Sequence, residues 1–220
     1  MCGYPPEHQV HGIAGCTTQA GGTSLTKSAL RRTLRARRRT ISIPLAVHAA
    51  LALAKRLSRL PHFRRARDVG IYWPMDGEIS LLPLMRMPGA RKKRFYLPVL
   101  VKPFARSLRF APFSAKSLLR NNRFTIPEPQ VKRRAQRPVR HLDLLLMPLV
   151  GFDRHGHRLG MGGGFYDRSL AHLHHRTAWQ RPRLVGVAYS CQEVPLLPVE
   201  PWDVPLHALC TESGCFTVTS

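Results

Sequence analysis

Five short apolar runs constrain the fold of this chain more than any other feature of its sequence. They are rich in β-branched, aromatic and leucine residues, and they cover residues 69–73, 95–99, 108–111, 142–147 and 184–189. Short runs that are apolar on both faces are typical of strands buried between layers of helices. Helical and glycine-rich segments separate the later runs, as parallel strands require. The sequence therefore predicts an α/β fold with a largely parallel sheet flanked by helices.

Helical periodicity is found before and between these runs. Residues 26–39 are predicted to form a basic amphipathic helix, because leucines recur one turn apart among arginines. A second helix is expected between its cap at Ser42 and a proline break at Pro61. We expect these two helices to pack as an N-terminal hairpin. Shorter helices are predicted over residues 80–87 and 165–174.

A glycine-rich loop is the strongest local signal. Four glycines precede the last predicted helix: Gly160, Gly162, Gly163 and Gly164. Glycines let backbone N–H groups approach an anion, and a helix N-terminus adds about half a positive charge. Arg158 before the loop can hold a phosphate, and Asp167 after it can hold a divalent ion. The loop lacks the Gly-Lys-Ser/Thr of a Walker A motif, and a flexible connection without a ligand is the alternative interpretation.

Two other segments carry polar side chains beyond predicted strands. Trp73 and Glu78 flank a glycine turn after the first strand, and the segment near the C-terminus contains Pro-Trp-Asp203. Ligands of open α/β sheets bind at the carboxyl ends of strands, so we expect these segments to lie near the glycine loop. For Trp73 a core position is the alternative, and for Asp203 a turn position.

Four blocks in fixed order resemble the 5-formyltetrahydrofolate cyclo-ligase family, and the resemblance covers Ala29 to Glu212. The blocks are the basic residues 31–39, Tyr-Trp-Pro-Met-Asp-Gly-Glu at 72–78, Arg-Leu-Gly-Met-Gly-Gly-Gly-Phe-Tyr-Asp at 158–167, and residues 185–203 ending in Pro-Trp-Asp. The resemblance implies a Rossmann-like fold. It also implies conversion of 5-formyltetrahydrofolate and ATP into 5,10-methenyltetrahydrofolate, ADP and phosphate, with Mg²⁺.

The resemblance also implies roles for particular residues. Arg31 and Arg35 match a basic pair that grips the ATP phosphates, although the family often has lysine where Arg31 stands. The matching nucleotide loop comprises Arg158, Leu159, Gly160, Met161, Gly162, Gly163, Gly164, Phe165 and Tyr166. Solvated helix charge is the alternative for the two helix arginines.

Folate and metal contacts are implied in the same way. Trp73 and Glu78 match folate-contacting positions, and loop residues Met161, Gly162, Gly163, Gly164 and Phe165 are assigned to the substrate as well. Asp167 and Asp203 match carboxylates associated with Mg²⁺, with a helix cap or turn as the alternative. The implied chemistry needs no protein nucleophile, because phosphoryl transfer depends on positioning and charge stabilisation. Arg158 and Asp167 are the positioning residues that we expect.

The charge balance is compatible with two kinds of partner. Lys and Arg number 35 against 12 Asp and Glu, a formal net charge of +23. A basic surface neutralises nucleic-acid phosphates, but a basic field also accelerates the capture of small polyanions such as nucleotides. The basic residues are spread along the chain without an aromatic RNA-binding signature. A nucleic-acid-binding module without catalysis is therefore the alternative function, and we expect no specific nucleic-acid partner.

The other segments set the boundaries of the domain. Residues 1–25 are expected to be a disordered extension, residues 26–220 a single domain, and residues 112–140 a long loop or lid. No apolar window is long enough to span a bilayer. The five scattered cysteines predict neither a zinc site nor a disulfide framework. We expect a cytoplasmic monomer that binds a small molecule and no membrane; the number of glutamates on that substrate is left open.

Overall fold

The computed structural model describes residues 26–100, 107–173 and 181–218. Helix α1 begins after Thr26, whose hydroxyl accepts the backbone N–H of Ala29, and Pro61 ends α2 and begins α3. The α-helices are α1 (Lys27–Arg39), α2 (Ile43–Arg59), α3 (Pro61–Arg65) and α4 (Phe165–Leu170). The short 3-10 helices are η1 (Leu82–Arg86), η2 (Ala90–Lys92), η3 (Arg133–Ala135), η4 (Val139–His141), η5 (Ala171–Leu173) and η6 (Ser190–Gln192).

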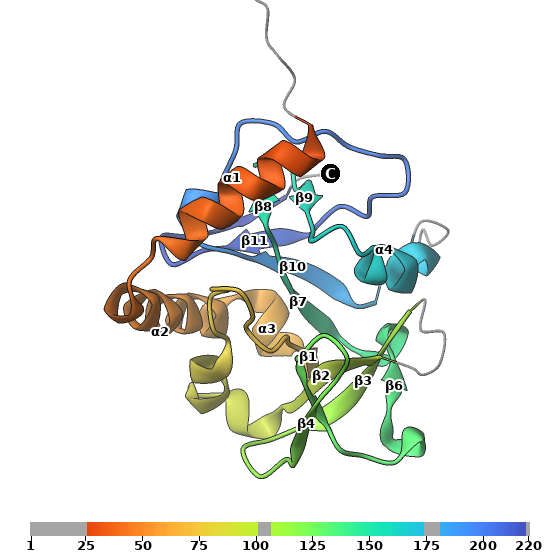
Figure 1. Cartoon of the computed structure of the whole chain (residues 1–220). Coiled ribbons are helices and arrows are strands. Elements are labelled where there is room, and N and C mark those ends of the chain that lie inside the picture. The colour runs from red at the N-terminus through yellow and green to blue at the C-terminus, as the bar shows by residue number, and fades with distance from the viewer. Residues whose placement is uncertain (1–25, 101–106, 174–180, 219–220) are drawn as a thin grey trace, which may run out of the picture.

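An eight-stranded sheet forms the centre of the molecule (Figure 1). Its order is β12-β11-β10-β7-β1-β2-β3-β6, with parallel pairs from β11 to β2 and antiparallel pairs at both edges. The strands are β1 (Asp68–Gly70), β2 (Arg94–Leu100), β3 (Leu108–Phe113), β6 (Arg137–Pro138), β7 (Leu144–Pro148), β10 (Arg183–Val187), β11 (Ala208–Cys210) and β12 (Cys215–Thr217). The predicted largely parallel α/β fold is confirmed.

Alternation along the strands divides the core into two layers. Leu144 and Leu146 of β7 face the layer that contains α2 and α3, whereas Leu145 and Met147 face the layer that contains α4. All four side chains are buried. Both faces of the central strands are therefore covered by helices, which explains why their sequences are apolar throughout.

The N-terminal helices do not form the predicted hairpin. The axes of α1 and α2 are bent by 102° at their junction, so the helices make a corner. Helix α1 packs on β8 (Gly151–Phe152) and η6, while α2 packs on η1 and α3. The arginine-rich α1 buries few apolar side chains and cannot cover a partner helix along its length. Among the described residues no single helix is long and apolar enough to cross a membrane, and α1 and α2 meet that criterion only jointly.

The segment 112–140 is more ordered than predicted. Strands β4 (Leu119–Asn121) and β5 (Pro127–Pro129) form a hairpin of their own, and β6 joins the edge of the main sheet. The first strand is shorter than predicted, because β1 ends at Gly70. The predicted disorder of residues 1–25 and the end of the last helix at residue 174 lie outside the described residues.

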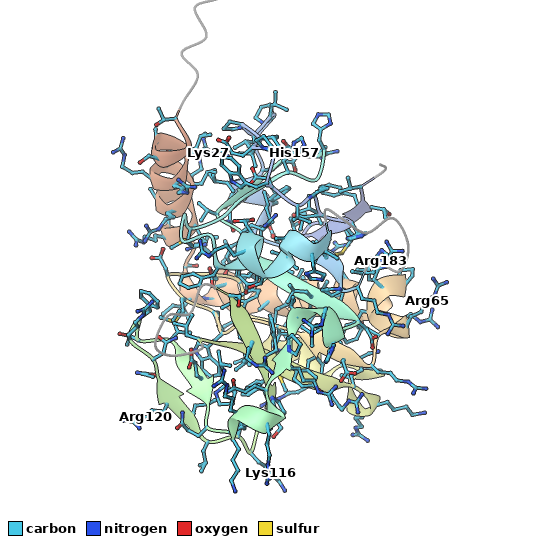
Figure 2. The ribbon with its side chains drawn as sticks, turned by 90° about the vertical axis from the view of Figure 1, so that its right-hand side faces the viewer. Lys27, Arg65, Lys116, Arg120, His157 and Arg183 are labelled. Carbon is cyan, nitrogen blue, oxygen red and sulfur yellow. A yellow bond between two sulfur atoms is a disulfide. The ribbon has the colours of Figure 1, made fainter. Side chains whose placement is uncertain are left out.

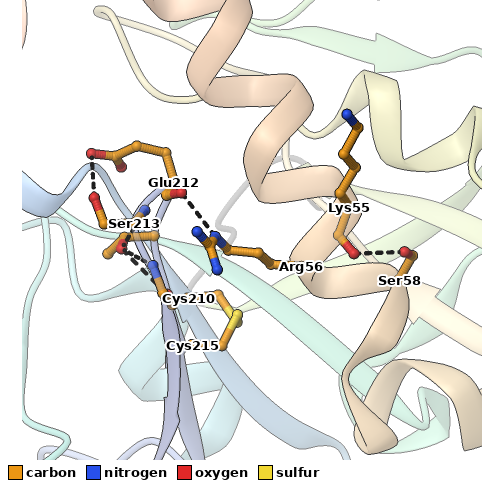
Figure 3. The surroundings of a disulfide bond; sticks show 9 residues. Lys55, Arg56, Ser58, Cys210, Glu212, Ser213 and Cys215 are labelled. Carbon is orange, nitrogen blue, oxygen red and sulfur yellow. Dashed lines mark hydrogen bonds between the residues drawn. A yellow bond between two sulfur atoms is a disulfide. The ribbon is translucent and has the colours of Figure 1, made fainter.

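A disulfide joins the last two strands, contrary to the sequence prediction (Figure 3). Cys210 of β11 and Cys215 of β12 are direct partners in an antiparallel pair. Register across two strands brings their sulfur atoms together, and spacing along the chain does not reveal such a pairing. Between them, the backbone carbonyl of Glu212 accepts a hydrogen bond from Arg56 of α2 at 2.9 Å.

Leu34 should carry much of the attachment of α1 to the domain. It is buried with Val150, Leu159 and Leu197 in a small core of its own. Leu34→Ala should lower the free energy of unfolding by about 2–5 kcal/mol, as expected for a buried leucine that leaves a cavity. Urea denaturation measures the change. Ile43→Ala, at a position 82% exposed, is the control and should have little effect; equal losses would contradict this assignment.

Candidate functional site

A pocket of about 660 Å³ lies at the carboxyl ends of β1, β2 and β7. Residues at or just beyond each strand end line it: Trp73 after β1, Pro98 in β2 and Pro148 in β7. Strands β2 and β7 lie on opposite sides of β1, so the strand order reverses here. Such a switch point is where open α/β sheets bind ligands. We call this cavity the loop pocket.

The glycine loop forms one side of the loop pocket. It follows a two-stranded hairpin of β8 and β9 (Arg158–Leu159) that continues directly from β7. Gly162 and Gly164 have positive φ values of 93° and 64°, which a side chain at Cβ would disfavour. Residues 158–167 all line the pocket.

Two arginines hold the loop in place. Arg31 of α1 donates from Nε to the carbonyl of Gly160 at 2.8 Å, and its guanidinium lies against Gly162. Arg158 donates to the carbonyl of Val204 at 2.5 Å and pairs with Asp167. Both arginines line the loop pocket, so an anion bound there would meet positive charge from two elements.

Lys27 and Arg31, rather than Arg31 and Arg35, are the basic pair of α1 at the pocket. Lys27 lines the loop pocket one helical turn before Arg31, and Arg35 does not line it. The prediction selected Arg35 because the family's basic pair was matched to Arg31 and Arg35, and the sequence does not show which turn of the helix faces the loop. If the family's basic pair is matched one turn earlier, to Lys27 and Arg31, its first residue is a lysine, as the family resemblance leads us to expect.

Arg35 instead contributes to a cluster of arginines around Asp76. The carboxylate accepts hydrogen bonds from Arg35 at 2.7 Å, from Arg38 at 3.0 Å and from Arg39 at 2.8 Å. Asp76 lies in the turn after Trp73 with a positive φ of 52°. Burial raises the pKa of Asp76, but the hydrogen bonds from Arg35 and Arg39 and the charge of Arg38 outweigh it and hold the pKa below its usual value.

The two candidate metal carboxylates both line the loop pocket, and each is paired with a cation. Asp167 pairs with Arg158, and Asp203 accepts Lys27 at 3.4 Å and the backbone N–H of Glu200 at 2.9 Å. In the described ranges no group of three or more His, Cys, Asp or Glu side chains is placed to hold a metal. Mg²⁺ takes one or two carboxylates together with phosphate oxygens and water, so this donor set fits Mg²⁺ bound with a nucleotide.

Glu78 and Trp73 form the wall opposite the loop. Glu78 accepts the backbone N–H of Met75 at 3.1 Å, and Trp73 packs edge-on against Phe113 at 6.1 Å between ring centroids. Burial raises the pKa of Glu78 to about 7, although the Met75 hydrogen bond and the charge of Arg38 oppose the shift. At neutral pH this carboxyl group can therefore both accept and donate a hydrogen bond.

The hairpin of β4 and β5 adds residues that the sequence analysis missed. Asn122, Phe124 and Ile126 at its tip line the loop pocket. The Phe124 ring lies edge-on to Phe165 at 6.1 Å, so the hairpin touches the glycine loop across the pocket. The aromatic residue after the paired asparagines was the available signal, because turn residues bounded by apolar ones predict a hairpin.

Fold and site together define an α/β protein with a glycine-rich, arginine-flanked loop at the switch point of its sheet. A sequence model of the 5-formyltetrahydrofolate cyclo-ligase family matches residues 23–212, and the chain belongs to that family. The 5-formyltetrahydrofolate cyclo-ligase of Escherichia coli K12 is 40% identical over 180 residues, which cover 82% of this chain and 97% of that protein. The Haemophilus influenzae relative of the same name is 43% identical over 146 residues, covering 65% and 74%.

A solved structure supports the same conclusion. The NMR structure of Aquifex aeolicus 5,10-methenyltetrahydrofolate synthetase superimposes with a TM-score of 0.73 at 29% identity. The match covers 88% of this chain and 93% of that protein. The fold and family expectations of the sequence analysis are thereby confirmed.

The raised pKa of Glu78 should appear as a pH-dependent loss of stability. The folded carboxyl has a pKa of about 7 and the unfolded one about 4.5, so the folded state holds the proton more tightly. Relative to Glu78→Gln, the wild type should therefore lose stability as pH rises from about 4.5 to about 7, with no further loss above that window. Urea denaturation at several pH values measures this difference. A difference that stays constant across the window would contradict the assignment.

Proposed function

We propose that the loop pocket is where this cyclo-ligase converts 5-formyltetrahydrofolate and ATP into 5,10-methenyltetrahydrofolate, ADP and phosphate. The observation that carries the proposal is the meeting of two features at one switch point. A glycine loop held by two cations, Arg31 and Arg158, shares the pocket with a wall made by Trp73 and Glu78. The first feature suits a polyphosphate, and the second suits a flat heterocycle with N–H donors.

The reaction proceeds by activating a poor leaving group. The formyl oxygen attacks the γ-phosphorus of ATP, the bond to the β–γ bridging oxygen breaks, and ADP leaves. Nitrogen 10 of the folate then attacks the formyl carbon and loses its proton. The former formyl oxygen departs with the phosphate. No side chain forms a covalent bond in these steps, so the protein contributes by binding and orienting the two substrates.

Charge around the loop provides that orientation. Backbone N–H groups of Gly162 to Gly164 and the guanidinium of Arg158 receive the phosphates, and Lys27 and Arg31 add positive charge from α1. The proximity of Arg31 to the Gly160 carbonyl supports this arrangement. Arg35 acts indirectly, because its hydrogen bond fixes Asp76 in the turn that carries Glu78.

Mg²⁺ is held by Asp167 and Asp203 in this proposal, together with the nucleotide. When bound, the ion neutralises charge that develops on the transferred phosphoryl group. Arg158 and Lys27, which pair with these carboxylates and line the pocket, would then turn to phosphate oxygens of the nucleotide.

The alternative of a nucleic-acid-binding module gains no support from the relatives. Figure 2 shows Arg65 and Arg183 together on one side of the molecule and Lys116 and Arg120 at its lower end, so these labelled cations gather in two places and not in a single stripe. The expectations of a cytoplasmic location, a monomer and no membrane partner stay predictions, and so does the glutamate content of the substrate.

One assay tests the proposed function. Purified protein is incubated with 5-formyltetrahydrofolate, ATP and Mg²⁺ while the absorbance of the methenyl product is followed. Product should accumulate with ADP in a one-to-one ratio, because each cyclisation consumes one phosphoryl donor. Omission of either substrate is the control. Absence of product from the folded protein with all components present would contradict the proposal.

The affinity for ATP should depend on the arginines that line the loop pocket and not on every arginine of α1. Arg31→Ala and Arg158→Ala should each weaken ATP binding by about tenfold or more, the value of a charge-assisted hydrogen bond. Arg35→Ala removes a charge from the same helix but lies outside the loop pocket, so its effect should be severalfold smaller. Isothermal titration calorimetry measures the three affinities. Equal losses of ATP affinity in all three variants would contradict the assignment and indicate a general effect of positive charge.

A further inference from the structure

A buried carboxylate in the turn between β8 and β9 takes no part in the proposed reaction (Figure 1). Asp153 is 0% exposed. Its Oδ1 accepts the backbone N–H groups of His155 at 3.0 Å and of His157 at 3.1 Å. Its Oδ2 accepts the backbone N–H of Leu197 at 3.0 Å and lies 2.9 Å from Nδ1 of His157. A carboxylate is costly to bury unless donors surround it, and these four contacts meet that requirement.

The two oxygens of Asp153 contact different parts of the chain. Both donors to Oδ1 belong to the turn itself, so this oxygen closes the hairpin of β8 and β9. Oδ2 instead reaches Leu197, which lies 44 residues further along the chain. A turn of this kind needs one side-chain acceptor oxygen, which an asparagine would also supply. The second oxygen therefore has a separate task, which is to join the hairpin to a distant segment.

The segment that contains Leu197 forms part of the loop pocket. Backbone hydrogen bonds tie its start, at Val194, and its end, at Leu206, to the hairpin. Between these two points Asp153 holds the backbone of Leu197, whose side chain is buried in the same small core as Leu34. The part of the segment that follows lines the loop pocket with Glu200, Trp202 and Asp203. These residues therefore enter the pocket from a segment whose middle is fixed by Asp153.

The hairpin also leads into the glycine loop. Strand β9 ends at Leu159, and Gly160 follows it directly. Asp153 therefore connects the loop that would receive the phosphates with the segment that carries Asp203. Mg²⁺ demands nearly ideal octahedral geometry. A ligand on a loosely held segment must also be ordered when the ion binds, which lowers the affinity.

We propose that Asp153 is a positioning residue for the complex of nucleotide and Mg²⁺, because its hydrogen bond from Leu197 fixes Asp203 relative to the glycine loop. The inference rests on the proposed function, in which Asp203 holds the ion and the loop receives the phosphates. Asp153 does not line the loop pocket, so it acts through the backbone and not by contact with ion or substrate. Replacing a residue that orients a metal ligand commonly lowers metal affinity about 10- to 100-fold.

Calorimetry with ATP tests this assignment without measuring turnover. The dissociation constant of ATP is measured in EDTA and again with excess Mg²⁺, and the ratio of the two constants is the gain in affinity that the ion provides. Asp153→Asn keeps the oxygen that closes the turn but places an amide N–H₂ group opposite the N–H of Leu197. This variant should bind ATP in EDTA as the wild type does, whereas its gain from Mg²⁺ should be about tenfold smaller.

Two comparisons separate positioning from a general loss of structure. In an Asp203→Asn background, Asp153→Asn should cause no further loss of the gain from Mg²⁺, because its effect passes through Asp203. Glu193→Gln makes the same change from carboxylate to amide in an exposed ion pair with Arg154, which joins the same hairpin to the start of the same segment. This control should leave the gain unchanged, since exposed ion pairs contribute little.

His157→Ala is the second variant, to be used if Asp153→Asn does not fold. The His157 ring is 30% exposed, and the backbone hydrogen bonds to Asp153 remain in this variant. Loss of the ring removes one of the two groups that hold Oδ2. The gain in ATP affinity from Mg²⁺ should therefore fall severalfold, while ATP binding in EDTA stays as in the wild type.

The outcomes distinguish this inference from the proposed function. An unchanged gain from Mg²⁺ in the folded variants, or an equal further loss of it in the Asp203→Asn background, would overturn the role of Asp153. Weaker ATP binding in EDTA would overturn it as well, because the glycine loop itself would then be disturbed. A wild type that cyclises the folate without any gain from Mg²⁺ would refute the inference alone. If the wild type forms no product, the proposed function itself fails.

Discussion

The hydrogen bonds of one buried guanidinium hold the functional end of the molecule together. The Arg38 side chain is 0% exposed and donates to the carboxylate and the carbonyl of Asp76 and, at 3.5 Å, to the carbonyl of Leu149. It thereby ties α1 to the segments that leave β1 and β7. Those segments carry Trp73 and Glu78 and lead into the glycine loop. Removing the partner of a buried cation costs several kcal/mol of stability. Helix α1 and the segments that leave β1 and β7 are therefore held in one relative placement.

The same arrangement explains how so basic a helix can pack on the domain. Arg35, Arg38 and Arg39 all donate hydrogen bonds to the Asp76 carboxylate. The positive charge on this part of α1 therefore serves to fix the turn that contains Asp76. The preceding turn, with Lys27 and Arg31, presents its charge to the loop pocket. One helix therefore has a half that fixes the Asp76 turn and a half that lines the loop pocket, and Leu34 between them supplies the apolar contact.

Local signals predicted the parallel sheet, α1 and α2, the glycine loop and its flanking Arg158 and Asp167, because strand and helix periodicity and turn glycines depend on neighbouring residues. Local signals could not predict how segments distant in the sequence pack against one another. Arg35 lies one helical turn beyond the residues of α1 that line the loop pocket, since packing sets which turn faces the loop. The hairpin that carries Phe124 and the pairing of Cys210 with Cys215 likewise depend on partners in space.

The hairpin of β4 and β5 is a sheet of its own, outside the hydrogen-bond ladder of the central sheet. Its tip nevertheless supplies Asn122, Phe124 and Ile126 to the wall of the loop pocket. Sequence changes at the tip therefore alter the shape of the pocket without disturbing the ladder or the buried core. The molecule can therefore reshape one wall of its pocket through an appendage while the scaffold beneath it keeps its packing.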